Sequence, residues 1–208
     1  MNESPLTDEQ LRVLMSPLNP ARVQSRPQGG HSLSYLAAWD VKATLIRVFG
    51  FGGFSADVTD SSIIRMERDV PAFTGKGKER KRKVDPDGNP DFNWSVTAMT
   101  TMRLYIPQID ASYTETAIAS QTGPDVGEVA DFAVKTAESD ALKRAAINLG
   151  TQFGLGLYDN GSTSEVIRRI FASGQEWPKL DPKEKAATDL ALQQSLGQKV
   201  ADENAEQA

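Results

Sequence analysis

The sequence predicts an α+β protein in which an antiparallel sheet of three to four strands packs against one long helix. Residues 55–70, 93–106 and 112–120 alternate between apolar and polar side chains and are rich in β-branched and aromatic residues, a pattern typical of strands. Residues 131–150 form a helix-length stretch that contains no proline and ends in Gly150, which favours a helix. The expected core is therefore β-β-β-α.

The helix expected at residues 131–150 carries an apolar stripe made mostly of alanine. The alanines that recur every fourth residue are Ala133, Ala137, Ala141 and Ala145. This spacing marks one face of a helix, and small side chains on that face let a sheet or helix approach closely. From spacing alone, Asp140 and Arg144 would form a surface ion pair worth about 0.3–0.5 kcal/mol.

Shorter helices are expected near the N-terminus. Thr7 and Gln10 have the spacing of a capping box, which predicts a brief helix within residues 4–16. Ser34 is a candidate N-cap for a helix that runs to about Phe49, with Gly50 ending it. Three prolines make the segment between these helices extended.

Two motifs resemble those of a known family. The stretch from Lys135 to Ala145, KTAESDALKRA, and residues 33–54, LSYLAAWDVKATLIRVFGFGGF, resemble in order and spacing two segments of the Rad fifty-two family of single-strand annealing proteins. The resemblance covers roughly residues 20–172 and suggests a member of phage or prokaryotic type. It implies a homo-oligomeric ring that binds single-stranded DNA and anneals complementary strands in recombination and double-strand-break repair, without ATP.

The resemblance also implies the DNA contacts. Lys143 and Arg144 correspond to the strand-binding pair of the family's signature helix, and Arg26 corresponds to an arginine just before a glycine pair. Lys135 on the same helix and Lys42 are further candidates. Cations of this kind bind phosphates irrespective of base sequence and leave the base edges free to pair.

Two positions depart from the family pattern and lower the positive charge expected at the groove that would bind the DNA strand. Ile147 stands where many relatives have a basic residue, and Asp40 stands where the eukaryotic relatives have one. A glycine-, proline- and charge-rich hairpin loop at residues 71–92 could compensate; it is long for a compact domain and therefore either functional or disordered. Its basic residues, expected at a second surface for another strand or duplex DNA, are Lys76, Lys78, Arg80, Lys81, Arg82 and Lys83. The alternative is a mobile loop that only keeps the protein soluble.

The charge distribution supports a division into three parts. The net charge is −5, unlike the strongly basic balance usual for nucleic-acid-binding domains, but the loop is basic while the C-terminal stretch is acidic. We expect an N-terminal helical arm at residues 1–20, a DNA-binding domain at 21–175 and an acidic, mostly disordered tail at 176–208.

Composition disfavours most enzyme chemistry. The chain has no cysteine and one histidine, so thiol chemistry and cysteine metal sites are excluded and histidine sites disfavoured. A nuclease would need clustered carboxylates, and the nearest approach, Asp85, Asp87 and Asp91, has the spacing of turns. We therefore expect no enzyme activity, metal or cofactor; the remaining alternative is a scaffold of the same fold that recruits recombination proteins without annealing.

The sequence and the resemblance also predict the location of the protein and its binding partners. No apolar stretch is long enough to span a membrane and the N-terminus lacks a signal peptide pattern, so we expect a cytoplasmic protein, in the bacterial host if phage-encoded. Expected partners are single-stranded DNA, duplex DNA at a second site, further copies of the chain, and a phage exonuclease or single-strand-binding protein.

Overall fold

The structure, a computed structural model, describes residues 6–28, 30–75 and 77–167. The chain divides into two compact units: residues 51–146 form one, and residues 1–50 together with 147–208 form the other. Lys76 and the expected tail at residues 176–208 lie outside the described residues. None of the described helices is long and apolar enough to cross a membrane.

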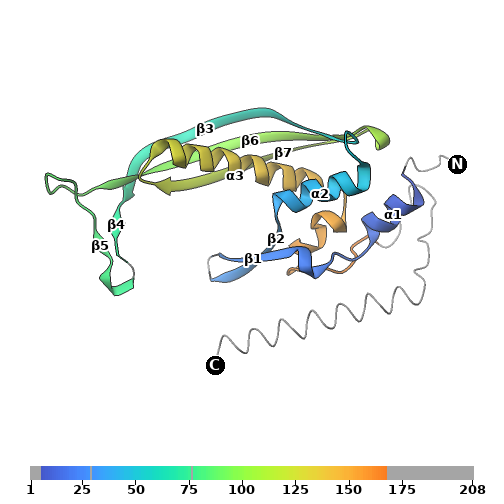
Figure 1. Ribbon diagram of the computed structural model, residues 1–208, viewed down its shortest axis with the longest axis horizontal. Coiled ribbons are helices and arrows are strands. Elements are labelled where there is room, and N and C mark those ends of the chain that lie inside the picture. The colour runs from blue at the N-terminus through green and yellow to red at the C-terminus, as the bar shows by residue number, and fades with distance from the viewer. Residues whose placement is uncertain (1–5, 29, 76, 168–208) are drawn as a thin grey trace, which may run out of the picture. The chain divides into compact units, whose positions relative to one another are not determined.

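The unit of residues 51–146 is built on the predicted three-stranded antiparallel sheet (Figure 1). Its strands are β3 (Ser55–Pro71), β6 (Phe92–Ile106) and β7 (Ala111–Gly123), in the order β3-β6-β7, with a short 3-10 helix (Pro107–Ile109) between β6 and β7. The long helix α3 (Val126–Ile147) follows. The mixed α+β fold with its three-strand sheet and covering helix is confirmed, although α3 begins and ends earlier than predicted.

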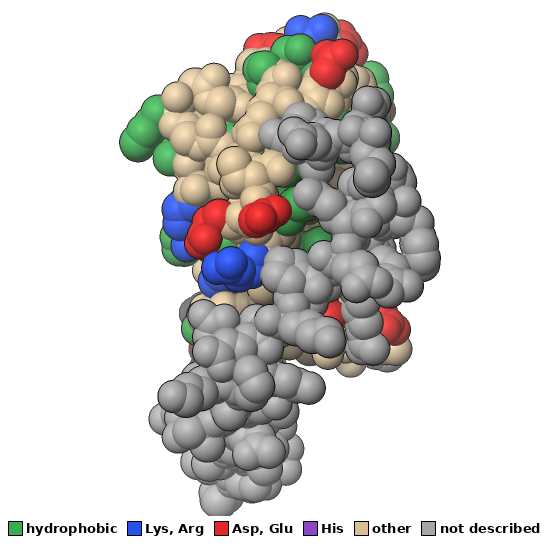
Figure 2. Space-filling view, turned by 90° about the vertical axis from the view of Figure 1, so that its right-hand side faces the viewer, with side chains coloured by type: hydrophobic (Ala, Val, Ile, Leu, Met, Phe, Trp, Pro, Cys, Tyr) green, Lys and Arg blue, Asp and Glu red, His purple; other side chains and the backbone are tan. Residues whose placement is uncertain are grey.

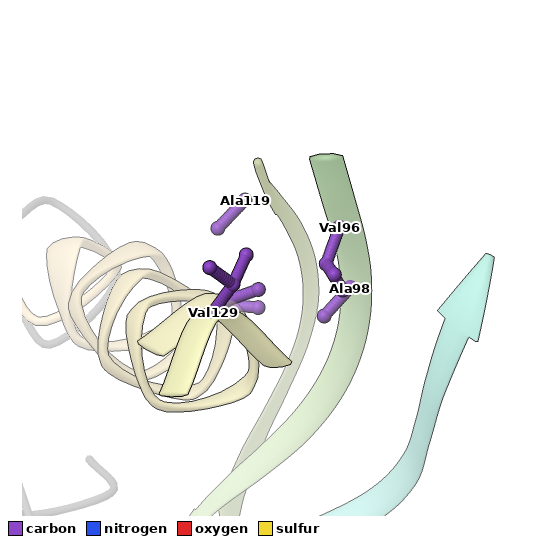
Figure 3. Close-up of a cluster of buried hydrophobic side chains, with 6 residues drawn as sticks. Val96, Ala98, Ala119 and Val129 are labelled. Atoms are coloured by element: carbon purple, nitrogen blue, oxygen red, sulfur yellow. The ribbon is translucent and has the colours of Figure 1, made fainter. Parts of the chain in front are cut away.

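Small side chains let α3 lie close to the sheet. The buried cluster beneath it joins Val96 and Ala98 of β6 and Ala119 of β7 to helix residues that include Val129 (Figure 3). At Gly123 a Cβ atom would lie 2.8 Å from Cγ2 of Val129, so a larger residue there would push the helix away. Four buried alanines spaced every fourth residue face inward, as expected: Ala133, Ala137, Ala141 and Ala145.

The expected loop at residues 71–92 is a folded hairpin, which we call the basic hairpin. It contains β4 (Phe73–Thr74), a 3-10 turn (Gly77–Glu79) and β5 (Lys81–Arg82). The N–H of Lys83 donates to the carbonyl of Ala72, and the N–H of Ala72 to the carbonyl of Asp91, with N···O distances of 2.9 and 3.1 Å. Figure 1 shows it projecting from the ends of β3 and β6.

The other unit combines a β-ribbon with short helices. Its elements are α1 (Asp8–Met15), a 3-10 turn (Pro20–Arg22), β1 (Val23–Gln28), β2 (His31–Leu36), α2 (Ala38–Phe49) and two 3-10 turns (Thr151–Phe153 and Leu155–Tyr158). The Thr7–Gln10 capping box of α1 is confirmed.

The predicted start of the second helix was wrong. Ser34 lies within β2, opposite Ser25 of β1, and α2 begins at Ala38 without a side-chain cap. Pairing with β1 satisfies the backbone of residues 31–36 in an extended conformation, so the helix forms only after that ladder ends.

Candidate nucleic-acid interface

The two basic residues at the centre of the expected site each contact a carboxylate. Nζ of Lys143 lies 2.6 Å from Oδ1 of Asp140, and Nη2 of Arg144 lies 3.3 Å from Oε2 of Glu115 on β7. The Lys143 side chain is 25% exposed and that of Arg144 53%. The pair expected between Asp140 and Arg144 is therefore replaced, because Arg144 reaches across to the sheet while Asp140 bonds the lysine one turn away.

The basic residues of α3 do not share one face. Successive helix residues point roughly 100° apart, so Lys143 and Arg144 diverge. Lys135, two turns earlier, forms its own pair with Asp131, with Nζ 2.7 Å from Oδ2. Each of these three cations thus has a separate acidic neighbour, and a phosphate would have to replace that neighbour.

Arg26 and Lys42 lie in the unit of residues 1–50 and 147–208, whereas α3 lies almost wholly in the other. Arg26 is exposed on β1, and its guanidinium carbon lies 5.5 Å from the centroid of the Tyr35 ring. Lys42 is exposed on α2 and forms no ion pair within the described part of the chain. Both side chains are therefore open to an anionic ligand.

The basic hairpin stacks two of its arginines on aromatic rings. The guanidinium of Arg80 lies 3.9 Å from the Phe73 ring centroid, and that of Arg82 lies 5.1 Å from the Phe92 ring centroid. Lys81 lies between them on β5 and is exposed; of Lys78 only the backbone is described. Such stacking holds a guanidinium in a defined place while its outward face and edges can still contact phosphate.

Asp91 holds the base of the basic hairpin together. Its Oδ2 lies 2.8 Å from Nζ of Lys83 and its Oδ1 lies 2.9 Å from Nη2 of Arg68. The hydrogen bond from Lys83, and a further one from the N–H of Phe92, lower the pKa of the Asp91 carboxyl. Sequence reasoning placed Lys83 with the DNA-binding residues and Asp91 in a turn; the structure gives both a structural contact, which charge counting along the chain could not reveal.

Arg22 explains why an acid can stand at position 40. The Arg22 guanidinium donates to both carboxylate oxygens of Asp40, to Oγ1 of Thr44, and to the side-chain and backbone oxygens of Gln152, over 2.7–3.1 Å. Asp40 is thus buried and neutralised within its unit. The acid at this position is a packing feature and adds no exposed negative charge.

The described residues contain no group of three or more His, Asp or Glu that could hold a metal ion. Asp85, the first member of the carboxylate set considered for a nuclease, accepts hydrogen bonds from the N–H groups of Asp87 and Asn89. The face in Figure 2 shows cationic side chains beside acidic ones. Of the carboxylates considered for a nuclease, Asp85 thus supports a turn and Asp91 forms ion pairs.

Comparison with known proteins gives one family and two similar proteins. Residues 8–170 match the family described as Rad52/22 family double-strand break repair protein. The DNA repair and recombination protein rti1 of Schizosaccharomyces pombe is 27% identical over 171 residues, which cover 81% of this chain and 40% of that protein. The DNA repair and recombination protein rad22 of the same yeast is 27% identical over 173 residues, covering 79% and 32% respectively. The chain thus spans less than half of either relative, and both relatives are fungal rather than of phage or prokaryotic type.

Proposed function

Because the chain belongs to the Rad52/22 family of double-strand break repair proteins, we propose that it binds single-stranded DNA and anneals complementary strands without ATP. Relatives with 27% identity are named as DNA repair and recombination proteins. The proposal is supported by the accessibility of Lys143 and Arg144 on α3, where the first side chain is half-buried and the second exposed. By resemblance, these two residues correspond to the family's strand-binding pair.

The ion pairs of α3 are compatible with DNA binding. Exposed pairs contribute only about 0–1 kcal/mol, so a phosphate can take the place of Glu115 beside Arg144 at little cost. Phosphate contacts of this kind hold a strand through its backbone and leave the bases available for pairing. The helix therefore supplies binding, and no catalytic group is required.

The basic hairpin supplies the second contact that annealing needs. Arg80, Lys81 and Arg82 form a short exposed run whose two arginines rest on Phe73 and Phe92. We assign this run to a second strand or duplex DNA. Lys83 is given a structural role here because Asp91 holds it.

A measurement of annealing tests the proposal directly. Complementary oligonucleotides, one carrying a fluorophore and the other a quencher, are mixed with the protein in the absence of nucleotide and metal, and the rate of pairing is followed. The parent should accelerate pairing. Lys143→Ala with Arg144→Ala should lower single-strand affinity, and the dependence of log affinity on log salt should flatten by roughly 0.7 for each phosphate bond that the variant can no longer form.

A matched control removes two cations elsewhere. Arg12 and Arg103 are half-exposed and each forms an ion pair with an acid, so Arg12→Ala with Arg103→Ala makes the same charge change on α1 and β6 instead of α3. This control should bind and anneal like the parent. Equal losses in both double variants would show that only total charge matters and would reject α3 as the strand-binding element.

The hairpin and α3 should fail in different ways. Replacing Arg80, Lys81 and Arg82 by glutamine should slow annealing while single-strand affinity stays close to that of the parent. If this variant instead loses binding while the α3 variant keeps it, the primary strand-binding element is the hairpin.

A second candidate function is a recombination scaffold of the same fold that does not anneal. It is favoured by the acidic neighbour beside each basic residue of α3 and by Ile147 at a position where many relatives carry charge. A scaffold would leave the rate of pairing at its uncatalysed value. In either case we propose a homo-oligomeric ring; duplex DNA and an exonuclease or single-strand-binding protein remain proposed partners.

A further inference from the structure

Helix α2 exposes a tryptophan that the fold does not use. Trp39 is 68% exposed, although the inner side of the same helix is well packed through Val41, Leu45 and Val48. Tryptophan buries a large apolar area when it contacts a partner. Its ring is therefore available to an external ligand.

The residues around Trp39 form a narrow apolar strip with a cation on each side. With roughly 100° per residue, Ala43 and Ile46 lie within about 40° of Trp39 around the helix axis, Lys42 about 60° to one side and Arg47 about 80° to the other. Lys42 is exposed and the Arg47 side chain is 61% exposed. We call these residues the α2 outer face.

The α2 outer face carries two exposed cations and no exposed acid. The one acidic residue of α2 is Asp40, which is 4% exposed and bonded by Arg22. Nη2 of Arg47 donates to Oγ1 of Thr44 and lies 3.7 Å from Oδ1 of Asp40, yet most of the Arg47 side chain remains exposed to solvent. An aromatic ring flanked by two exposed cations complements a ligand that has both flat rings and phosphates.

We propose that the α2 outer face binds single-stranded DNA by stacking a base on Trp39 while Lys42 and Arg47 contact the adjoining phosphates. This inference rests on the proposed function and adds to it a base contact, because the contacts assigned to α3 and the basic hairpin involve phosphates only. Stacking on an aromatic side chain tolerates any base, since every base has a flat face, and is worth about 1–3 kcal/mol per base. Non-specific strand binding combines these two kinds of contact.

Tryptophan fluorescence reports the contact directly. Trp94→Phe with Trp177→Phe leaves Trp39 as the sole tryptophan of the chain. An oligothymidylate titrated into this variant should quench its emission, with a midpoint equal to that of binding measured independently by anisotropy of labelled DNA. Binding without quenching or spectral shift would overturn the stacking while leaving the proposed function intact; absence of binding by the parent would reject both.

An abasic strand separates stacking from charge. Trp39→Ala should weaken binding of oligothymidylate by at least about fivefold, the lower end of the stacking range, and should leave unchanged the affinity for an abasic oligonucleotide of equal length. Lys42→Gln should lower the affinity for both oligonucleotides by the same factor. Equal effects of Trp39→Ala on the two strands would overturn the proposal.

Controls distinguish a protein partner and general damage. Phe132→Ala removes an aromatic ring of similar exposure, 63%, from α3 and should not discriminate between the two strands, while Trp39→Phe should restore much of the discrimination. Light scattering of Trp39→Ala should give the particle size of the parent. A smaller particle would mean that Trp39 contacts another copy of the chain, and the DNA assignment would be withdrawn.

Discussion

The Arg22 guanidinium and the Asp40 carboxylate form a buried ion pair, with Nη2 2.9 Å from Oδ2 and side-chain exposures of 15% and 5%. Gln152, which also accepts from Arg22, donates in turn to the carbonyls of Ser16 and Pro17. The pair therefore links segments that are distant in sequence but belong to one unit. Its contribution is to the fold of that unit, and Asp40 adds no exposed acid to the unit's surface.

Removing one member of this pair should destabilise the protein strongly. Arg22→Met or Asp40→Leu leaves a buried charge without its partner, which typically costs about 3–5 kcal/mol. Urea unfolding followed by circular dichroism measures the loss. The double variant should be more stable than either single variant; a double variant whose loss equals the sum of the two would show that the residues are not coupled.

The spacing of side chains along the sequence was sufficient to predict the three strands of the sheet and the buried face of the long helix. The three alternating strands and the alanine stripe were predicted with boundaries near those observed, because periods of two and of about 3.6 residues are written into the sequence itself. The Thr7–Gln10 box succeeded for the same reason, since its partners lie one helical turn apart.

Contacts between different elements could not be predicted from side-chain spacing. Ser34 met the requirements of an N-cap, yet the ribbon partner Ser25 determined its conformation. Arg144 was assigned to a neighbour on its own helix and instead reaches Glu115 of β7. In both cases the deciding partner lies on a strand that is a different element from the residue's own, and its proximity depends on the assembled fold.

Glu115 should restrain the DNA affinity of Arg144. Glu115→Gln removes the carboxylate that lies 3.3 Å from Nη2 of Arg144 while keeping the size of the side chain. We expect single-strand affinity to rise by about twofold to fivefold, as for the loss of one exposed ion pair, and to do so most at low salt. Fluorescence anisotropy over a salt series checks this.

The matched control is Glu9→Gln, which removes the acidic partner of Arg12 on α1. It changes net charge equally and should leave affinity within error of the parent. A rise of equal size in both variants would indicate a general charge effect.

Asp91 should control the order of the basic hairpin. Asp91→Asn keeps the side-chain shape but removes the charge that binds Lys83 and Arg68. Backbone amides of residues 72–83 should then exchange faster with deuterium, and annealing should slow while single-strand binding persists. Asp87→Asn makes the same change at an exposed turn residue of the hairpin and should do neither.

Protonation of the Asp91 carboxyl should destabilise the basic hairpin at low pH. The pKa of Asp91 is lowered in the folded hairpin, first by the hydrogen bond from Lys83, so the charged form is favoured there. This stabilisation is fully present above the ordinary carboxyl pKa of about 3.9 and is lost as pH falls through the lower folded value. Opening of the hairpin, measured by amide exchange in residues 72–83, should therefore not change with pH near neutrality. Opening should increase only below about pH 4. In Asp91→Asn this increase at low pH should be absent.

Strand β3 exposes apolar side chains at one edge of the sheet. It is an edge strand, and Val58, Ile63 and Met66 are each more than 40% exposed. They pair with Met102, Ala98 and Val96 of β6, so they lie on the α3 side of the sheet. The buried cluster under α3 nevertheless draws on β6 and β7 and, among the described residues, includes none from β3 (Figure 3).

An apolar strip beside an unpaired strand edge favours association with another chain. The parent should therefore scatter light as a particle several times larger than the 22.6 kDa chain. Ile63→Lys with Met66→Lys should shrink that particle, because two charges would have to be buried at the contact. Asp60→Lys with Ser62→Lys adds lysines to the same strand at positions paired with Thr101 and Met99, on the opposite face, and should leave the particle intact. A parent that remains monomeric at micromolar concentration with DNA present would reject the ring, and equal dissociation by both double variants would reject this face of β3 as its interface.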